Sequence, residues 1–177
     1  MIKVWIGSLA AYNAGALVGE WVDLPKSNEE LNEIIDAINK EAEKVDGVYL
    51  AEEIDIFDFE TEIDPLFDDL KGLSLWEMNE VAEKLDELDE YERTEFAAIV
   101  EVTDSIEEAF EVLGNGGAII LHDIHEHEDL GIAWVEELGG MEVPDHLKNY
   151  IDYEEIGRDL TFDGWYITTN GLAVCIN

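Results

Sequence analysis

The sequence predicts an α+β fold made of several small domains. Strand-like alternation is confined to the two ends of the chain, helix signals fill the middle, and the 177 residues carry a formal net charge of −36. Hydrophobic residues make up 47% of the sequence, so the chain can bury a core and is not a disordered acidic tail. We expect three domains: an α+β domain (antiparallel sheet plus helix) at 1–64, a helical domain at 65–106 and a second α+β domain (small sheet plus helices) at 107–177.

The N-terminal part combines strands with one helix. Residues 3–24 are predicted to form two strands joined by the loop "AAYNAGAL". Ser27 and Glu30 have the spacing of a capping box, and an apolar helical stripe follows them. The stripe consists of Leu31, Ile34, Ile35, Ile38 and Ala42. "VYLAEEIDIF", at 48–57, predicts a third strand.

The middle of the chain is predicted to be helical. Ser74 with Glu77, and Ser105 with Glu108, repeat the capping-box spacing. Apolar residues recur at helical intervals through 65–113, and Gly114 is the expected stop. The pattern therefore indicates several helices in succession.

The C-terminal part returns to strands. "GGAIIL" predicts a short buried strand, and the four-residue spacing of Leu130, Trp134 and Leu138 predicts a helix over 123–138. The last residues alternate around Asn170 and Gly171, which is typical of a hairpin with a two-residue turn.

The charge restricts the partners that this chain can have. Its 45 acidic and 9 basic residues give a net charge far above the magnitude of about 2 to 8 that serves solubility. Such a surface repels nucleic acid, anionic membranes and anionic substrates, and it attracts cationic partners or a site built to hold DNA. Duplex DNA has one charge per about 1.7 Å, so 36 charges correspond to roughly 60 Å, or about 18 base pairs. A two-fold dimer would double this length, and an elongated shape would lower the self-repulsion.

Carboxylates in two segments are the expected partner-binding residues. The first segment, 52–69, contains nine acidic and no basic residues, and the second covers the central helices. Each carboxylate could also be an ordinary solvated helix or strand residue, so the prediction concerns the set. The set is Glu52, Glu53, Asp55, Asp58, Glu60, Glu62, Asp64, Asp68, Asp69, Glu77, Glu80, Glu83, Asp86, Glu87, Asp89 and Glu90.

The stretch "ILHDIHEHEDLG", at 120–131, places three of the four histidines among four carboxylates. His125 and Asp129 are four residues apart on the expected helix and could chelate a metal together, but no HExxH or paired CxxC is present. A metal-binding acidic protein therefore stays an alternative to a solvated surface. His122 is expected to end the strand, and His127 to point away from His125.

Other chemistry is poorly supported. No segment has the acidic spacing and central glycine of a calcium loop, and none has a nucleophile elbow, a Walker lysine or a dinucleotide pattern. We expect no enzyme activity and no cofactor. The single cysteine, Cys175, allows no internal disulfide and fits a reducing cytoplasm, and no apolar stretch is long enough to span a membrane.

The acidity could also arise from halophilic adaptation or from binding to a basic protein. Halophilic adaptation gives acidic surfaces, but seven of the nine basic residues are lysine and large aliphatic residues are plentiful, which suits that origin poorly. An adaptor that binds a basic protein would carry the same charge.

Three segments resemble the ArdA antirestriction family. They are "YNAGALVGEWVDLP" at Tyr12–Pro25, "VPDHLKNYIDYEEIGRDL" at Val143–Leu160 and "ITTNG" at Ile167–Gly171. The resemblance implies a curved, elongated chain of three small domains that dimerises through the C-terminal domain. It implies a DNA mimic, carried on plasmids and conjugative transposons, that occupies the DNA groove in the methyltransferase core of type I restriction-modification enzymes. It would block restriction and, by the same occupancy, modification.

Some residues lie outside what the resemblance explains. The three-histidine pattern departs from the family, so no role transfers to it. The helix at 124–138 has more apolar surface than one small core needs, which predicts a dimer contact formed by Leu130, Ile132, Trp134, Val135 and Leu138. Aromatic residues in the matching segments are expected in the core or at domain contacts, and Arg158 in an internal ion pair. These aromatic residues are Tyr12, Trp21, Tyr150 and Tyr153.

Overall fold

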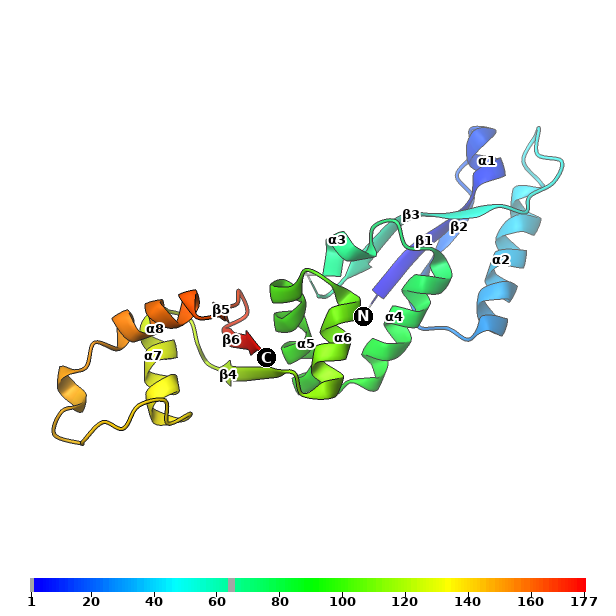
Figure 1. Cartoon of the computed structure of the whole chain (residues 1–177). Coiled ribbons are helices and arrows are strands. Elements are labelled where there is room, and N and C mark those ends of the chain that lie inside the picture. Colours follow the sequence, from blue (N-terminus) through cyan, green and yellow to red (C-terminus); the bar gives the residue numbers. More distant parts are fainter. Residues whose placement is uncertain (1, 64–65) are drawn as a thin grey trace. The chain divides into compact units, whose positions relative to one another are not determined.

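The computed structural model describes residues 2–63 and 66–177, without the side chain of Phe67. It confirms the α+β class: the described residues form two three-stranded antiparallel sheets and eight α-helices (Figure 1). The chain divides into two compact units, Met1–Asp89 and Glu90–Asn177. The helices of the expected central domain are shared between them, because α4 (Leu75–Glu87) belongs to the first unit and α5 (Glu90–Thr103) to the second. The division into three domains stays a prediction.

The first unit is a sheet with helices on one side. Strands β1 (Ile2–Ser8), β2 (Gly19–Leu24) and β3 (Ile54–Thr61) pair in the order β2-β1-β3. The inner face of the sheet is apolar and buried, and α2 (Asn28–Ala42) and α4 contact β1 and β2. Its buried residues are Ile2, Val4, Ile6, Val22 and Leu24.

The predicted elements of this unit are confirmed with two changes. The capping box of Ser27 and Glu30 is complete and starts α2, and that of Ser74 and Glu77 starts α4. The loop "AAYNAGAL" instead contains a short helix, α1 (Leu9–Asn13), which Ser8 caps through a bond from the amide of Ala11. The third strand covers 54–61 rather than 48–57, because its alternating residues pair with β1 only from Ile54 onward.

A buried amide joins α4 to the segment that follows β2. Asn79 is 3% exposed, and its side chain accepts a bond of 2.8 Å from the amide of Lys26 and donates one of 2.9 Å to the carbonyl of Lys26. The Leu24–Pro25 peptide bond before this contact is cis. The short helix α3 (Phe67–Leu70) supplies the buried Leu70.

The second unit packs helices on both faces of its sheet. The strands are β4 (Ala118–His122), β5 (Trp165–Ile167) and β6 (Leu172–Ile176), in the order β4-β6-β5. Leu121, Trp165 and Ala173 share one face and form a core with residues of α7 (His127–Glu136) and α8 (Tyr153–Phe162). The opposite face, which contains Leu172 and Val174, contacts α5 through β6.

Two glycines allow α7 and α8 to cross at backbone contact. A Cβ on Gly131 would lie 2.0 Å from the carbonyl oxygen of Tyr153, and a Cβ on Gly157 would lie 1.7 Å from that of His127. Neither position can carry a side chain without moving a helix.

The remaining C-terminal predictions need smaller corrections. Helix α6 (Ile106–Asn115) passes the expected stop at Gly114 and ends at Gly116, which has a positive φ of 62°. Helix α7 covers 127–136 rather than 123–138, because Asp123 adopts a positive φ of 59° directly after the strand. The final hairpin turns through Thr168–Gly171, and not through two residues.

The segment between α7 and α8 has little regular structure. It contains one 3₁₀ turn, η2 (Lys148–Tyr150), and the ion pair of Lys148 with Glu136 ties it to α7 at 3.2 Å. Among the described residues, no helix is both long and apolar enough to cross a membrane.

Candidate functional site

The strand β3 turns three carboxylates of the predicted site to one face. Asp55 and Asp58 are three residues apart, so strict alternation would place them on opposite faces of the sheet. A β-bulge at Phe57 inserts one extra residue between the pairs Trp5–Asp58 and Ile6–Ile56. As a result Asp55, Asp58 and Glu60 all lie opposite outward-facing residues of β1.

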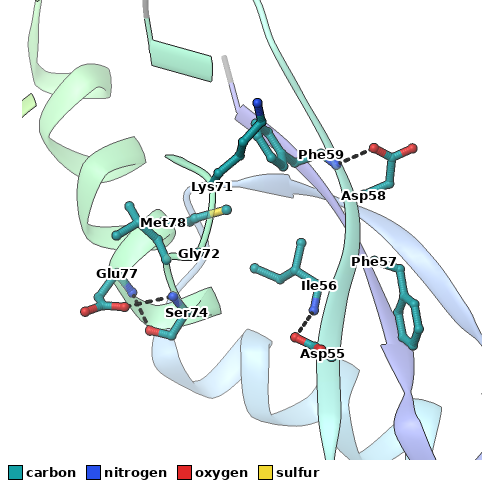
Figure 2. Close-up of a pocket in the computed structure, with 11 residues that line it drawn as sticks. Asp55, Ile56, Phe57, Asp58, Phe59, Lys71, Gly72, Ser74, Glu77 and Met78 are labelled. Carbon is teal, nitrogen blue, oxygen red and sulfur yellow. Dashed lines mark hydrogen bonds between the residues drawn. The ribbon is translucent and has the colours of Figure 1, made fainter. Parts of the chain in front are cut away.

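Figure 2 shows the consequence of the bulge. The consecutive residues Phe57 and Asp58 lie on the same side of β3, away from Met78 of α4, whereas Ile56 points toward Met78. A pocket is lined by residues of β3, by residues of α4 such as Glu77 and by the turn before α4, which includes Lys71.

Helix α4 carries the second group of predicted carboxylates. Its buried stripe faces the core, and its five acidic residues are all exposed. They span about 15 Å of helix axis at about 1.5 Å per residue, or one carboxylate per about 3 to 4 Å. One strand of duplex DNA has one phosphate per about 3.4 Å, so the linear spacing is comparable. The five are Glu77, Glu80, Glu83, Asp86 and Glu87.

The structure places nearly all of the predicted carboxylates on the surface. Asp69 is half-buried, and Asp64 lies outside the described residues. All the others are exposed, namely Glu52, Glu53, Asp55, Asp58, Glu60, Glu62, Asp68, Glu77, Glu80, Glu83, Asp86, Glu87, Asp89 and Glu90. Exposure permits contact with a partner but does not test it, so their role stays a prediction.

Several of these carboxylates are oriented by their own backbone. Asp55 accepts a bond of 2.9 Å from the amide of Ile56, and Asp58 accepts one of 2.9 Å from the amide of Phe59. Glu77 accepts a bond of 2.8 Å from the amide of Ser74, and this bond and the Ser74 hydroxyl lower the pKa of Glu77. The hydroxyl and amide of Ser27 likewise lower the pKa of Glu30.

Three ion pairs within the described part of the chain are short-range. Lys44 pairs with Glu41, Lys71 with Asp68 and Arg158 with Glu155, each three residues away in sequence. The last pair confirms the expected internal ion pair of Arg158. Because these pairs are local, each joins a basic residue to a carboxylate of its own segment.

The negative charge is divided equally between the two units. The first has 24 acidic and 6 basic residues and the second has 21 and 3, so each has a net charge of −18. Neither unit alone is the acidic part of the molecule.

An aromatic surface on the first unit was not predicted from the sequence. Trp5 pairs with Trp21, and the ring of Phe57 lies 5.4 Å from that of Trp5 and 5.2 Å from that of Tyr12. Trp21 and Tyr12 are 38% and 56% exposed, so they are not core residues, and the expected alternative, a domain contact, stays a prediction. The alternation of Lys3, Trp5 and Gly7 with buried aliphatic residues was the available signal, since it places Trp5 on the outward face.

We call this surface the outer sheet face. It is the face of the first sheet opposite the buried core. It consists of Lys3, Trp5, Gly7, Gly19, Trp21, Asp23, Asp55, Phe57, Asp58 and Glu60.

Two of the three clustered histidines have side-chain contacts that differ from each other. His122 ends β4, and its Nε2 lies 2.6 Å from the Tyr91 hydroxyl and 3.2 Å from a Glu95 oxygen, both on α5. The imidazole of His125 lies against Gly171, where a Cβ would be 2.5 Å from it. Asp129, the proposed chelating partner of His125, accepts the amide bonds of His125 and Glu126 at the start of α7. Among the described residues no group of three or more His, Cys, Asp or Glu could hold a metal ion.

The residues predicted for the dimer contact differ in accessibility. Leu130 is fully buried and Val135 is 6% exposed, so both side chains pack inside their own chain and are not accessible to a second copy. Ile132 and Leu138 are 38% and 42% exposed, and Trp134 is half-buried. Tyr153 is also half-buried, whereas Tyr150 is 84% exposed and is not a core residue.

Comparison with known proteins adds one finding. A family model described as antirestriction protein (ArdA) matches residues 4–174, which covers nearly the whole chain. Among curated proteins, none matches it.

Proposed function

Because the chain belongs to the ArdA family of antirestriction proteins, we propose that it is a DNA mimic that inhibits type I restriction-modification enzymes. Its carboxylates would take the places of DNA phosphates in the DNA-binding groove of the methyltransferase core. Lys and Arg side chains that neutralise phosphates would then pair with Asp and Glu. The enzyme would lose access to DNA for restriction and for modification.

One observation carries this proposal. The net charge of −36 is spread equally over two compact units, with carboxylates on α4 at a linear spacing comparable to that of the phosphates of one DNA strand. An ordinary acidic binding site would concentrate charge in one cleft. Carboxylates at this density on each of the two units suit a partner that binds many consecutive phosphates.

The mechanism needs no catalytic residue. Phosphate contacts supply much of the affinity of a DNA-binding protein and carry no sequence information. An inhibitor that copies only the phosphates should therefore act on enzymes with different recognition sequences. We further propose that two copies associate through the second unit, with Ile132, Trp134 and Leu138 at the contact.

The test is competition for the methyltransferase core. A labelled duplex bound to the core is titrated with this protein at low and at high salt, and displacement is followed by fluorescence anisotropy. We expect full displacement at low salt, with an apparent affinity that falls steeply as salt rises. Ion pairs between the two proteins release bound counterions, and a high salt concentration opposes this release. A second type I enzyme with another recognition sequence should give the same result.

The required control is a variant with fewer carboxylates on α4. Glu80→Gln/Glu83→Gln/Glu87→Gln should weaken the displacement and reduce its salt dependence. If saturating wild-type protein leaves DNA bound to both enzymes, the proposal is wrong, and binding to a basic protein of another class becomes the better interpretation.

A further inference from the structure

The outer sheet face combines aromatic rings with carboxylates. Trp5 stands directly opposite Trp21 on β2 and opposite Asp58 on β3. Residues directly opposite each other in antiparallel strands have Cβ atoms about 4.5 to 5.5 Å apart. The side chains of Trp5 and Asp58 are therefore attached to neighbouring backbone positions on the same face of the sheet.

The rings of this face are held in place by the backbone beneath them. A Cβ on Gly7 would lie 2.4 Å from the Trp5 ring and 2.6 Å from the Phe57 ring, and a Cβ on Gly19 would lie 2.7 Å from the Trp5 ring. The two glycines thus make room for rings that lie close to the sheet. Trp5 and Phe57 also meet edge to face, at an interplanar angle of 78°. A partner would meet a surface that is already ordered.

This face already holds one cation. The Nζ of Lys3 lies 5.6 Å from the centroid of the Trp21 ring, within the range of a cation–π interaction. Lys3 is paired in register with Asp23 on one side and with Glu60 on the other. The Lys3 site shows the arrangement that a cation takes on this surface, which is a ring below it and carboxylates beside it.

The end of the outer sheet face that contains Asp55 and Asp58 also has aromatic rings and carboxylates, but none of the residues that form this end is a lysine or an arginine. Within the described residues, neither Asp55 nor Asp58 forms an ion pair, and each is oriented by one bond from the next backbone amide. Both residues are exposed, and they lie on β3 on either side of Phe57, opposite Gly7 and Trp5 of β1. The unit's charge of −18 adds a field that attracts cations to this end.

Arginine fits these parts better than lysine. A guanidinium group is planar, stacks on aromatic rings and binds a carboxylate through two parallel bonds. A lysine ammonium is a strongly hydrated point charge that gains less from a ring. We propose that the outer sheet face binds arginine side chains of a basic partner protein in preference to lysine side chains. The proposal rests on the proposed function only for the partner's identity, a type I enzyme whose DNA groove presents arginine.

The experiment compares arginine and lysine homopeptides of equal length. Because the two peptides have equal length, they carry the same charge. Their dissociation constants are measured by calorimetry at one ionic strength. For the wild type we expect about fivefold tighter binding of the arginine peptide, the size of a moderate cation–π contribution. Asp55→Asn/Asp58→Asn should bring the ratio close to one while each Asn still accepts its amide bond. Phe57→Leu, which removes a ring at the end of the face that holds no cation and keeps an apolar side chain there, should lower the ratio independently.

The matched control removes the same charge from another surface. Glu80→Gln/Glu87→Gln should weaken both peptides and leave their ratio unchanged. A wild-type ratio near one, or an equal fall of the ratio in the control, would overturn the proposal.

The DNA-displacement assay, run on the same variants, separates the two proposals. Intact displacement with no arginine preference overturns only the inference about arginine. Arginine preference without displacement overturns only the assignment to a type I enzyme.

Discussion

The first unit leaves one face of its sheet open to solvent, whereas the second packs helices against both faces. The two nevertheless have the same net charge of −18. In the first unit, carboxylates can therefore lie on a strand beside aromatic rings, as Asp55 and Asp58 do. In the second, β4 and β6 contain no acidic residue, and the carboxylates lie on helices and in the segments between them.

This difference shows that the acidic surface does not depend on one type of architecture. A helix with one apolar stripe buries that stripe and exposes the carboxylates on its other sides, as α4 does. A strand does so only on a face that no helix covers, and β3 needs a bulge to align three of them. The units can then be tested separately, because each depends on its own contacts.

The largest effect is expected where α7 and α8 cross. Gly157→Ala would place a methyl group 1.7 Å from the carbonyl oxygen of His127, so the helices must separate. We expect a loss of about 3 kcal/mol in the free energy of unfolding. Hydrogen exchange measured by mass spectrometry should show faster exchange in 118–176 and unchanged exchange in 2–61.

Gly114→Ala is the matched control for this substitution. Gly114 is also a helical glycine of the second unit, but nothing lies within 4 Å of its Cβ position. Alanine there should be neutral or slightly stabilising. If both variants behave alike, or if Gly157→Ala also loosens the first unit, the separation of the two units is wrong.

A smaller effect, confined to the first unit, is expected at Asn79. Asn79→Ala removes both bonds to Lys26 and leaves the amide and carbonyl of that residue without these partners. We expect a loss of about 2 kcal/mol, the cost of unsatisfied buried polar groups. The urea midpoint measures it, and Asn32→Ala, at an exposed position of α2, should change it little. Faster exchange in the second unit would contradict the prediction.

The sequence predicted the parts of this fold that depend on local chemistry. Ser27 with Glu30 and Ser74 with Glu77 started helices where expected, because a capping box is complete within four residues. The bulge at Phe57 and the contact of Gly131 with Gly157 were not predictable, since each depends on residues far apart in sequence. For the candidate site, the exposure of most chosen carboxylates followed from composition. The aromatic surface beside them required the strand register.

The smallest effect is expected from pH, and it too belongs to the first unit. The folded state lowers the pKa of Glu30 and Glu77 below the ordinary value of 4.5, through bonds from Ser27 and Ser74. Each group therefore adds stability above about pH 4.5, and that contribution is lost as the pH falls through the folded pKa. Glu30→Gln/Glu77→Gln should lower the urea midpoint relative to Glu33→Gln/Glu80→Gln, which removes two charges from the same helices without a capping bond. This difference should be largest at about pH 7 and should shrink below about pH 4.5. A difference that stays constant between about pH 7 and about pH 3 would show that the two caps do not depend on charge.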